Sequence, residues 1–203
     1  MRIGAVILAA GGSFRLGHAK QLLRLDGEGL LRRSVRVGLQ SKASNIVVVL
    51  GAEANVCAAE IADLPVRITI HSTWRNGIAS SIVAGLQTLR LLDPGLEGVV
   101  FMVCDQPHLT TEVIDSLIHA HQVLGKGVIA CRYGEITGVP ALFGKAYFEA
   151  ISGLTGDQGA RSLFHLCEDD LACISFPEGC ADIDTREDYE RYLDEAHISL
   201  NHA

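Results

Sequence analysis

VILAAGGSFRLGHAK, residues 6–20, carries the most informative pattern in the chain. Its first residues complete an apolar segment, 3–9, that predicts a β-strand, and two glycines then end that strand. Glycine lets the backbone adopt conformations barred to other residues and lets a ligand come close to the main chain. Backbone N–H groups left free in such a loop form an anion site, and Arg15 and Lys20 add positive charge beside it. The stretch therefore predicts a strand followed by a loop that binds a polyphosphate.

Two familiar glycine-rich motifs do not fit this loop. A P-loop ends in Gly-Lys-Ser/Thr, whereas Gly17 is followed here by His18. The dinucleotide fingerprint requires Gly-x-Gly-x-x-Gly, and the glycines here stand at positions 11, 12 and 17. The loop is similar instead to the nucleotidyltransferase signature Leu-Ala-Ala-Gly-x-Ser-x-Arg-x-Gly-x-x-Lys. It matches that signature at Leu8, Ala9, Ala10, Gly11, Ser13, Arg15, Gly17 and Lys20.

An ordinary strand-to-helix turn with surface charges is the alternative explanation of the loop. It does not account for the glycines, the serine and both cations all standing where the signature has them. The resemblance implies that the loop, Gly12 included, binds the nucleotide, and that Arg15 and Lys20 take part in catalysis by holding its phosphates.

Length and composition restrict the class of protein. The 203 residues predict one domain, 1–203, and no apolar run approaches the roughly 20 residues of a membrane-spanning helix. Arg2 stands at the start of the first strand, so we expect no secretory signal. The net charge of −7 argues against a nucleic-acid binder. Six cysteines without a Cys-x-x-Cys pair indicate reduced thiols in a cytoplasmic enzyme.

Apolar segments alternate with segments of helical periodicity along most of the chain. This alternation predicts an α/β fold, a mainly parallel sheet covered by helices on both faces, with ligands at the carboxyl ends of the strands. A turn at Asp26-Gly27 ends a short connection, 22–25. The expected strands are 3–9, 45–50, 66–70, 99–103, 127–131, 138–143 and 173–176; the expected helices are 30–40, 52–62, 78–92, 111–124, 159–167 and 185–196.

Carboxylates stand at two places suited to Mg²⁺. Asp105 follows the apolar segment 99–104, and a carboxylate at the end of a buried parallel strand can bind Mg²⁺; capping of the next helix is the alternative. Asp182 and Asp184 alternate along an extended segment, so they face the same side. We expect one of the two to complete the metal site, without deciding which. Thr185 with Asp188 also resembles a capping box that starts the last helix.

Three further motifs have counterparts in the same enzymes. Trp74-Arg75-Asn76-Gly77-Ile78-Ala79-Ser80-Ser81 resembles a stretch that lies against the nucleotide, which implies contacts from Gly77 and from Ser80 or Ser81. The segments 138–143 and 156–161 resemble Gly-x-Pro-x-x-Phe and Gly-Asp-x-Gly-Ala-Arg, which line the acceptor side. The implied acceptor residues are Gly138, Pro140, Phe143, Gly156, Asp157 and Arg161. Simple turn chemistry and helix starts are the alternatives for each motif.

Five motifs in the same order resemble the MobA-like nucleotidyltransferases that finish the molybdenum cofactor, over nearly the whole chain. Leu-Ala-Ala-Gly and Asp-Gln-Pro are similar to the cytidylyltransferase branch. The resemblance implies a Rossmann-like nucleotidyltransferase fold, Mg²⁺ as cofactor, and transfer of CMP from CTP to a molybdopterin-type cofactor. Further partners would be a client molybdoenzyme or its chaperone. A transferase using GTP or a sugar phosphate, and a carrier of the cofactor without catalysis, remain alternatives.

Overall fold

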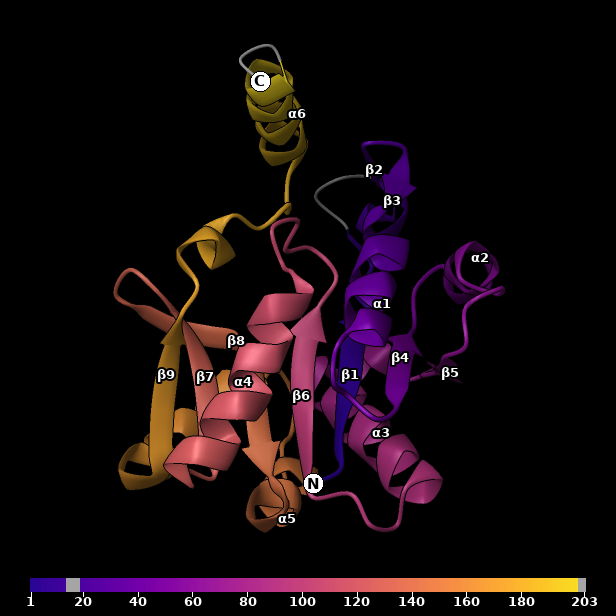
Figure 1. The fold of residues 1–203 in the computed structure, drawn as a ribbon. Helices are drawn as coiled ribbons and strands as arrows, with labels where there is room; N and C mark the ends of the chain where they lie inside the picture. Colours follow the sequence, from indigo (N-terminus) through magenta and orange to yellow (C-terminus); the bar gives the residue numbers. More distant parts are fainter. Residues whose placement is uncertain (14–18, 201–203) are drawn as a thin grey trace.

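The computed structural model describes residues 1–13 and 19–200. Its centre is a seven-stranded sheet in the order β5-β4-β1-β6-β8-β7-β9, with helices on both faces (Figure 1). The strands are β1 (Ile3–Ala9), β2 (Arg24–Leu25), β3 (Glu28–Gly29), β4 (Ile46–Leu50), β5 (Arg67–Ile70), β6 (Gly98–Val103), β7 (Val128–Tyr133), β8 (Ile136–Gly144) and β9 (Leu171–Ser175). The α-helices are α1 (Leu30–Gln40), α2 (Ala54–Glu60), α3 (Ile78–Leu92), α4 (Thr111–Leu124), α5 (Phe148–Ser152) and α6 (Arg186–Leu200).

The expected α/β fold is confirmed, and β1 lies at its middle. Its neighbours β4 and β6 both run parallel to it, paired from Ala5 with Ile46 and from Ile3 with Gly98. A strand with a parallel neighbour on each side and helices above and below is covered everywhere, which is why it is apolar throughout instead of alternating. This position fixes where the loop after β1 begins.

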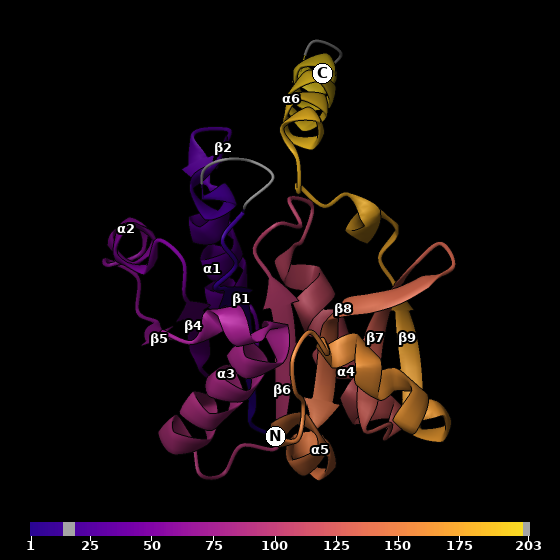
Figure 2. The ribbon, with the colours of Figure 1, turned by 180° about the vertical axis from the view of Figure 1, so that it is seen from behind.

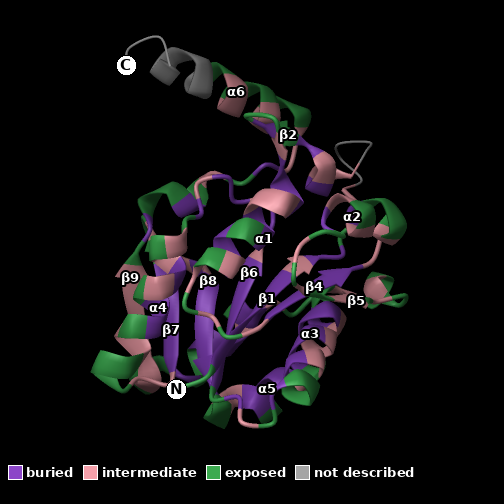
Figure 3. Ribbon diagram, turned by 45° about the vertical axis from the view of Figure 1, so that its right-hand side comes forward, coloured by how far each residue is buried: buried purple, intermediate pink, exposed green. Residues whose placement is uncertain are grey.

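Two apolar layers hold the helices to the sheet. Helices α1, α2 and α4 pack on the face seen in Figure 1. Helices α3 and α5 pack on the opposite face, turned to the viewer in Figure 2, together with the 3₁₀ helix Ala160–Leu166. Figure 3 shows the buried strands as a continuous layer between these two sets of helices. Among residues 1–13 and 19–200, none of the helices has the length and apolar character needed to cross a lipid bilayer.

The structure departs from the sequence-based expectation at three elements. Strand β8 runs antiparallel to both neighbours, β6 and β7, so the sheet is mixed at this side. Segment 159–167, expected as an α-helix, is the 3₁₀ helix Ala160–Leu166. The connection 22–25 contains strand β2, which pairs with β3 across the expected turn at Asp26-Gly27. This turn is confirmed, because Asp26 and Gly27 adopt φ values of 52° and 82°, as a type I′ turn requires. The remaining short 3₁₀ helices are Lys20–Leu22, Trp74–Asn76, Lys145–Tyr147, Glu168–Asp170 and Pro177–Cys180.

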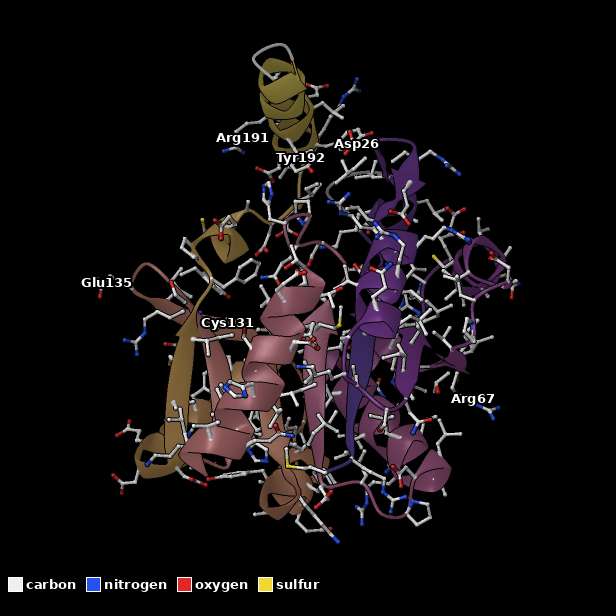
Figure 4. The ribbon with its side chains drawn as sticks, in the orientation of Figure 1. Asp26, Arg67, Cys131, Glu135, Arg191 and Tyr192 are labelled. Atoms are coloured by element: carbon white, nitrogen blue, oxygen red, sulfur yellow. The ribbon has the colours of Figure 1, made fainter. Side chains whose placement is uncertain are left out.

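Helix α6 stands above the carboxyl ends of the strands, next to the β2–β3 hairpin (Figure 1). The expected capping box at its start is confirmed: Asp188 N–H donates to Thr185 Oγ1 at 3.2 Å, and Thr185 N–H donates to the Asp188 carboxylate at 2.9 Å. The Tyr189 hydroxyl donates to the Arg24 carbonyl at 2.7 Å. Figure 4 shows Tyr192 and Arg191 at the end of α6 that faces the sheet. These contacts dock the start of α6 on the hairpin.

Candidate active site

A pocket of about 570 Å³ opens at the carboxyl ends of β1 and β6. Its walls come from four separate parts of the chain: the loop after β1, the start of α3, the end of β6 and the loop before Ala160–Leu166. The lining residues are Leu8, Ala9, Ala10, Gly11, Gly12, Lys20, Gln21, Trp74, Arg75, Gly77, Ile78, Ser81, Val103, Cys104, Asp105 and Asp157. Nine of the residues predicted to bind nucleotide therefore lie around one cavity, and Arg15 lies outside the described residues.

Gln21 holds the loop after β1 in place, although no sequence motif had singled this residue out. Its side chain is 1% exposed, and its amide nitrogen donates to the carbonyls of Ala9 and Gly11, each at 2.9 Å. Ser13, with φ 48°, accepts a hydrogen bond from the Lys20 N–H at 3.0 Å. The predicted nucleotide contact of Ser13 thus coincides with a role in shaping the loop, and Ser13 is not among the residues that line the pocket.

Two motifs that the sequence assigned to different substrates meet at this pocket. Gly77 has φ 97°, and a Cβ there would lie 2.1 Å from the Gly156 carbonyl oxygen, so only glycine fits. Ala79 N–H donates to that same carbonyl at 3.1 Å. The contact brings Asp157, predicted on the acceptor side, into the wall of the predicted nucleotide pocket.

The two serines after Gly77 have different surroundings. Ser80 donates to the Gly77 carbonyl at 2.7 Å and lies 2.8 Å from His71 Nε2. Because the only hydroxyl hydrogen of Ser80 is used on Gly77, the hydrogen in the second contact belongs to His71. Ser81, which is buried, lines the pocket instead. Of the two predicted contacts, the packing supports Ser81.

Lys20 connects the two predicted acidic motifs. Its ammonium group bonds to Asp105 Oδ2 and lies 2.8 Å from Asp184 Oδ1. The side chains of Lys20 and Asp105 are 17% and 16% exposed, and that of Asp184 is 44% exposed. Burial opposes the charged form of Lys20, but the charge of Asp105 and the hydrogen bonds to both carboxylates outweigh it and raise the Lys20 pKa above its usual value. Lys20 is therefore a permanent cation between two carboxylates.

Asp182 lies close to the same charges. Its pKa is raised to about 6 because it is partly desolvated and because Asp105 and Asp184 are negatively charged nearby. Lys20 and the Gln106 amide counteract this rise. Three carboxyl groups thus share one region, and Lys20 bonds to two of them.

The residues around Lys20 fit a divalent cation whose coordination is completed by substrate phosphates. Asp105 Oδ1 is buried and has no hydrogen-bond partner among the described residues, so one carboxylate oxygen is left with nothing to satisfy it. No three His, Cys, Asp or Glu side chains in residues 1–13 and 19–200 have the arrangement of a protein-only metal site. Mg²⁺ is commonly bound by one or two carboxylates together with substrate phosphates, which suits this arrangement.

Gln106 is a second residue that the sequence motifs did not assign. Its buried amide nitrogen donates to the Val139 carbonyl at 3.1 Å and to the Gly179 carbonyl at 3.0 Å. Four residues after Gly179, Ile183 N–H donates to the Asp105 carbonyl at 3.0 Å. These bonds tie β8 and the segment before α6 to the end of β6, and so carry Asp182 and Asp184 to Asp105.

The residues predicted on the acceptor side fall into two groups. Gly138 and Pro140 are buried on β8, and a Cβ on Gly138 would lie 2.0 Å from the Tyr133 hydroxyl. Phe143 is fully buried and stacks on Phe164 at 6.0 Å between ring centroids, so its contact with an acceptor would require the core to open.

The second group is exposed. Gly156, Asp157 and Arg161 are all accessible in the structure. Tyr133 has its pKa raised by burial and by Asp182, while Arg161 opposes the rise, so charges of both signs act on this hydroxyl. Arg161 and Asp182 therefore influence the same part of the surface, beside β7.

Comparison with known proteins gives a consistent family. Residues 5–171 match the family model of the MobA-like NTP transferase domain. The chain is 27% identical over 197 residues to the purine catabolism protein PucB of Bacillus subtilis (strain 168), covering 91% of this chain and 93% of that protein. It is 29% identical over 203 residues to nicotine blue oxidoreductase of Paenarthrobacter nicotinovorans, covering 94% of this chain and 96% of that protein.

Two solved structures share the fold over nearly the whole chain. Rv0371c from Mycobacterium tuberculosis H37Rv has a TM-score of 0.82 at 28% identity, covering 96% of this chain and 99% of that chain. A complex of the same protein with manganese has a TM-score of 0.79 at 26% identity, with the same coverage.

Proposed function

The chain belongs to the MobA-like NTP transferase family, and on that premise we propose that it transfers a cytidylyl group from CTP to the phosphate of a molybdopterin-type molybdenum cofactor. The observation that carries the proposal is the single pocket that joins the loop after β1, Lys20 and Asp105. A carrier without catalysis has no need for a partly buried cation beside a carboxylate whose second oxygen has no partner among the described residues. The choice of CTP and of this acceptor rests on the motif resemblance.

The proposed reaction is an in-line displacement at the α-phosphorus. A phosphate oxygen of the acceptor forms the new P–O bond, the bond from the α-phosphorus to the oxygen bridging to the β-phosphate breaks, and pyrophosphate leaves with that electron pair. Such a transfer needs positioning and charge neutralisation more than a protein nucleophile. Nothing in this scheme requires a side chain to be nucleotidylated.

Each part of the pocket would have one task. The backbone N–H groups of Gly11 and Gly12 face the phosphates, and Gln21 keeps that loop rigid. Lys20 leaves its carboxylate partners to neutralise the β- and γ-phosphates and the departing pyrophosphate. Ser81 and the backbone at Gly77 contact the nucleotide, and Asp157 stands where nucleotide and acceptor meet. Arg161, whose charge acts on the Tyr133 hydroxyl against that of Asp182, would attract an anionic acceptor.

Mg²⁺ belongs to this proposal as the expected cofactor. We assign Asp105 and Asp184 to Mg²⁺, because both carboxylates form ion pairs with Lys20, whereas Asp182 forms none with Lys20. Bound there, Mg²⁺ would neutralise charge on the reacting phosphates. The manganese complex of a relative supports a divalent cation in this family without identifying the ligands in this chain.

The test is pyrophosphate release from the purified protein with Mg²⁺ and each of the four NTPs, with and without molybdenum cofactor. Release with CTP alone among the NTPs, and only with the cofactor present, is the expected result. Release with GTP would support a nucleotidyltransferase but contradict the proposed choice of CTP. Absence of release with all four, under conditions where a known transferase works, would favour the carrier. Lys20→Ala should abolish pyrophosphate release. Lys145→Ala is the matched control and should leave release unchanged, because Lys145 is exposed and lies at the other end of the sheet.

A further inference from the structure

Lys20 bonds to both of the carboxylates that we assign to a divalent cation. Its ammonium group bonds to Oδ2 of Asp105 and to Oδ1 of Asp184, one oxygen on each carboxylate. These two contacts join residues that lie 85 and 164 positions away from Lys20 in the sequence. The protein therefore supplies its own counter-ion for the carboxylate pair.

A divalent cation and this ammonium group cannot share the pair favourably. A cation bound to both carboxylates would share its ligands with the ammonium group, and the side chains of Lys20 and Asp105 are only 17% and 16% exposed. Like charges repel more strongly where water is excluded.

The ammonium group has another place to go. Lys20 begins the short 3₁₀ helix Lys20–Leu22, and its backbone N–H is fixed to Ser13 Oγ at 3.0 Å. Its four-carbon side chain can rotate while the backbone stays in place. Lys20 lines the same pocket as Gly11 and Gly12, so phosphates held by that loop lie within reach of the ammonium group.

We propose that Lys20 keeps a divalent cation away from Asp105 and Asp184 until nucleotide phosphates draw its ammonium group off, so that metal and nucleotide bind as one unit. This inference rests on the proposed function only in taking the pocket to be a nucleotide site. It reverses a simple expectation: removing a residue of the active site should improve metal binding by the free protein. The opposing explanation is that Lys20 holds the two carboxylates together, in which case its removal weakens metal binding.

The test is a titration of the nucleotide-free protein with Mn²⁺, in which electron paramagnetic resonance counts the ion that remains free. Three proteins are compared: wild type, Lys20→Met and Lys145→Met. Both variants lose one positive charge, but Lys145 is exposed and follows β8 at the opposite end of the sheet. We expect Lys20→Met to bind Mn²⁺ about tenfold more tightly than wild type, within the usual range of coupling between two ligands, and Lys145→Met to bind like wild type.

A second pair of variants locates the effect. Asp105→Asn should remove the gain in the Lys20→Met background and change little in the wild-type background, because wild type scarcely uses that site without nucleotide. Lys20→Gln, which keeps a polar group of similar reach, replaces Lys20→Met if thermal unfolding shows that the methionine variant is not folded. The same tightening and the same dependence on Asp105 are expected of it.

Three results would overturn the inference: unchanged Mn²⁺ affinity in the Lys20 variants, weaker affinity, or an equal gain in Lys145→Met. None of them bears on the proposed transfer, since pyrophosphate release decides that separately. Conversely, tighter Mn²⁺ binding that depends on Asp105 would stand even if the protein used another base or acceptor.

Discussion

Asp105 and Asp184 meet at Lys20, but two very different regions of the molecule carry them. Asp105 follows β6, a strand paired with β1 on one side and β8 on the other, with a buried run from Gly98 to Met102. Asp184 lies in a segment without regular structure between the 3₁₀ helix Pro177–Cys180 and α6. The first region is held by a strand ladder and two apolar layers, the second by a few separate polar bonds.

The two carboxylates of the site are therefore held in place with different firmness. The position of Asp105 is fixed by contacts that many residues share, so a single substitution nearby changes it little. The position of Asp184 depends on Gln106 bonding to Gly179, on Ile183 bonding to Asp105, and on the capping box that starts α6. We therefore expect the tail segment to be the part of the site that single substitutions can displace.

The largest expected effect separates the two carboxylates. Asp105→Asn should lower turnover by roughly 10²–10³-fold, the loss typical of removing one preorganised electrostatic group in a water-poor site. Asp184→Asn should lower it by only about tenfold, because the Asp184 side chain is 44% exposed and water screens its charge. The measurement is pyrophosphate release at saturating nucleotide, with Asp63→Asn as a surface control. Equal losses would mean that the tail is as firmly built as the end of β6.

The next effect concerns the contact between the two loops at the pocket. Gly77→Ala should destabilise the protein by about 3 kcal/mol, because alanine meets the Gly156 carbonyl and is strained at φ 97°, ψ 168°. Gly125→Ala is the matched control: it has φ 65° but open space around it, so it tests the strain without the collision. Urea unfolding of the three proteins gives the comparison, and similar losses for both variants would show that the loop contact contributes little.

A smaller effect tests the bonds to the tail directly. Gln106→Leu removes the donor shared by Val139 and Gly179, which should let Asp184 shift and lower turnover about tenfold. Binding of the nucleotide alone should stay close to wild type, because Gln106 does not line the pocket. Gln122→Leu, on the exposed side of α4, is the control. A loss of nucleotide affinity equal to the loss of turnover would contradict the division into framework and tail.

The smallest effect is at the start of α6. Thr185→Ala should cost about 1 kcal/mol of helix stability, the usual value of such a cap. The hydrogen bonds from Thr185 hold the pKa of Asp188 below its usual value. A carboxyl whose pKa is lower in the folded state stabilises that state above its unfolded pKa, and loses this as pH falls through its folded pKa. The measurement is helical circular dichroism from about pH 6 to about pH 2, a range that brackets the pKa of an unfolded aspartate. The helical signal of Thr185→Ala should fall less with acid than that of wild type.

Sequence patterns predicted the regular part of this molecule well. Helices α1, α3 and α4 begin and end where the periodicity places them, and the buried strands β1, β4 and β6 follow from their continuous apolar runs. Local rules also predicted the capping box at Thr185. Each of these features depends on residues adjacent in the chain, which is why sequence periodicity and cap residues suffice to find it.

The antiparallel direction of β8 and the role of Gln106 depend on contacts between residues far apart in the chain. An apolar segment fits a parallel or an antiparallel neighbour equally well, so only the pairing of β8 with β6 and β7 sets its direction. Gln106 was visible only as part of an Asp-Gln-Pro motif, and its partners Val139 and Gly179 lie 33 and 73 residues away.

The alternating α/β framework, the position of the loop after β1 and the residue types that can hold a polyphosphate could all be predicted from sequence, because they depend on local pattern and chemistry. Only the tertiary structure decided that Lys20 lies between Asp105 and Asp184, that Ser81 and not Ser80 faces the pocket, and that Phe143 belongs to the core. Contacts between distant residues depend on how strands pair and how layers pack, and the spacing of residues along the chain does not predict either.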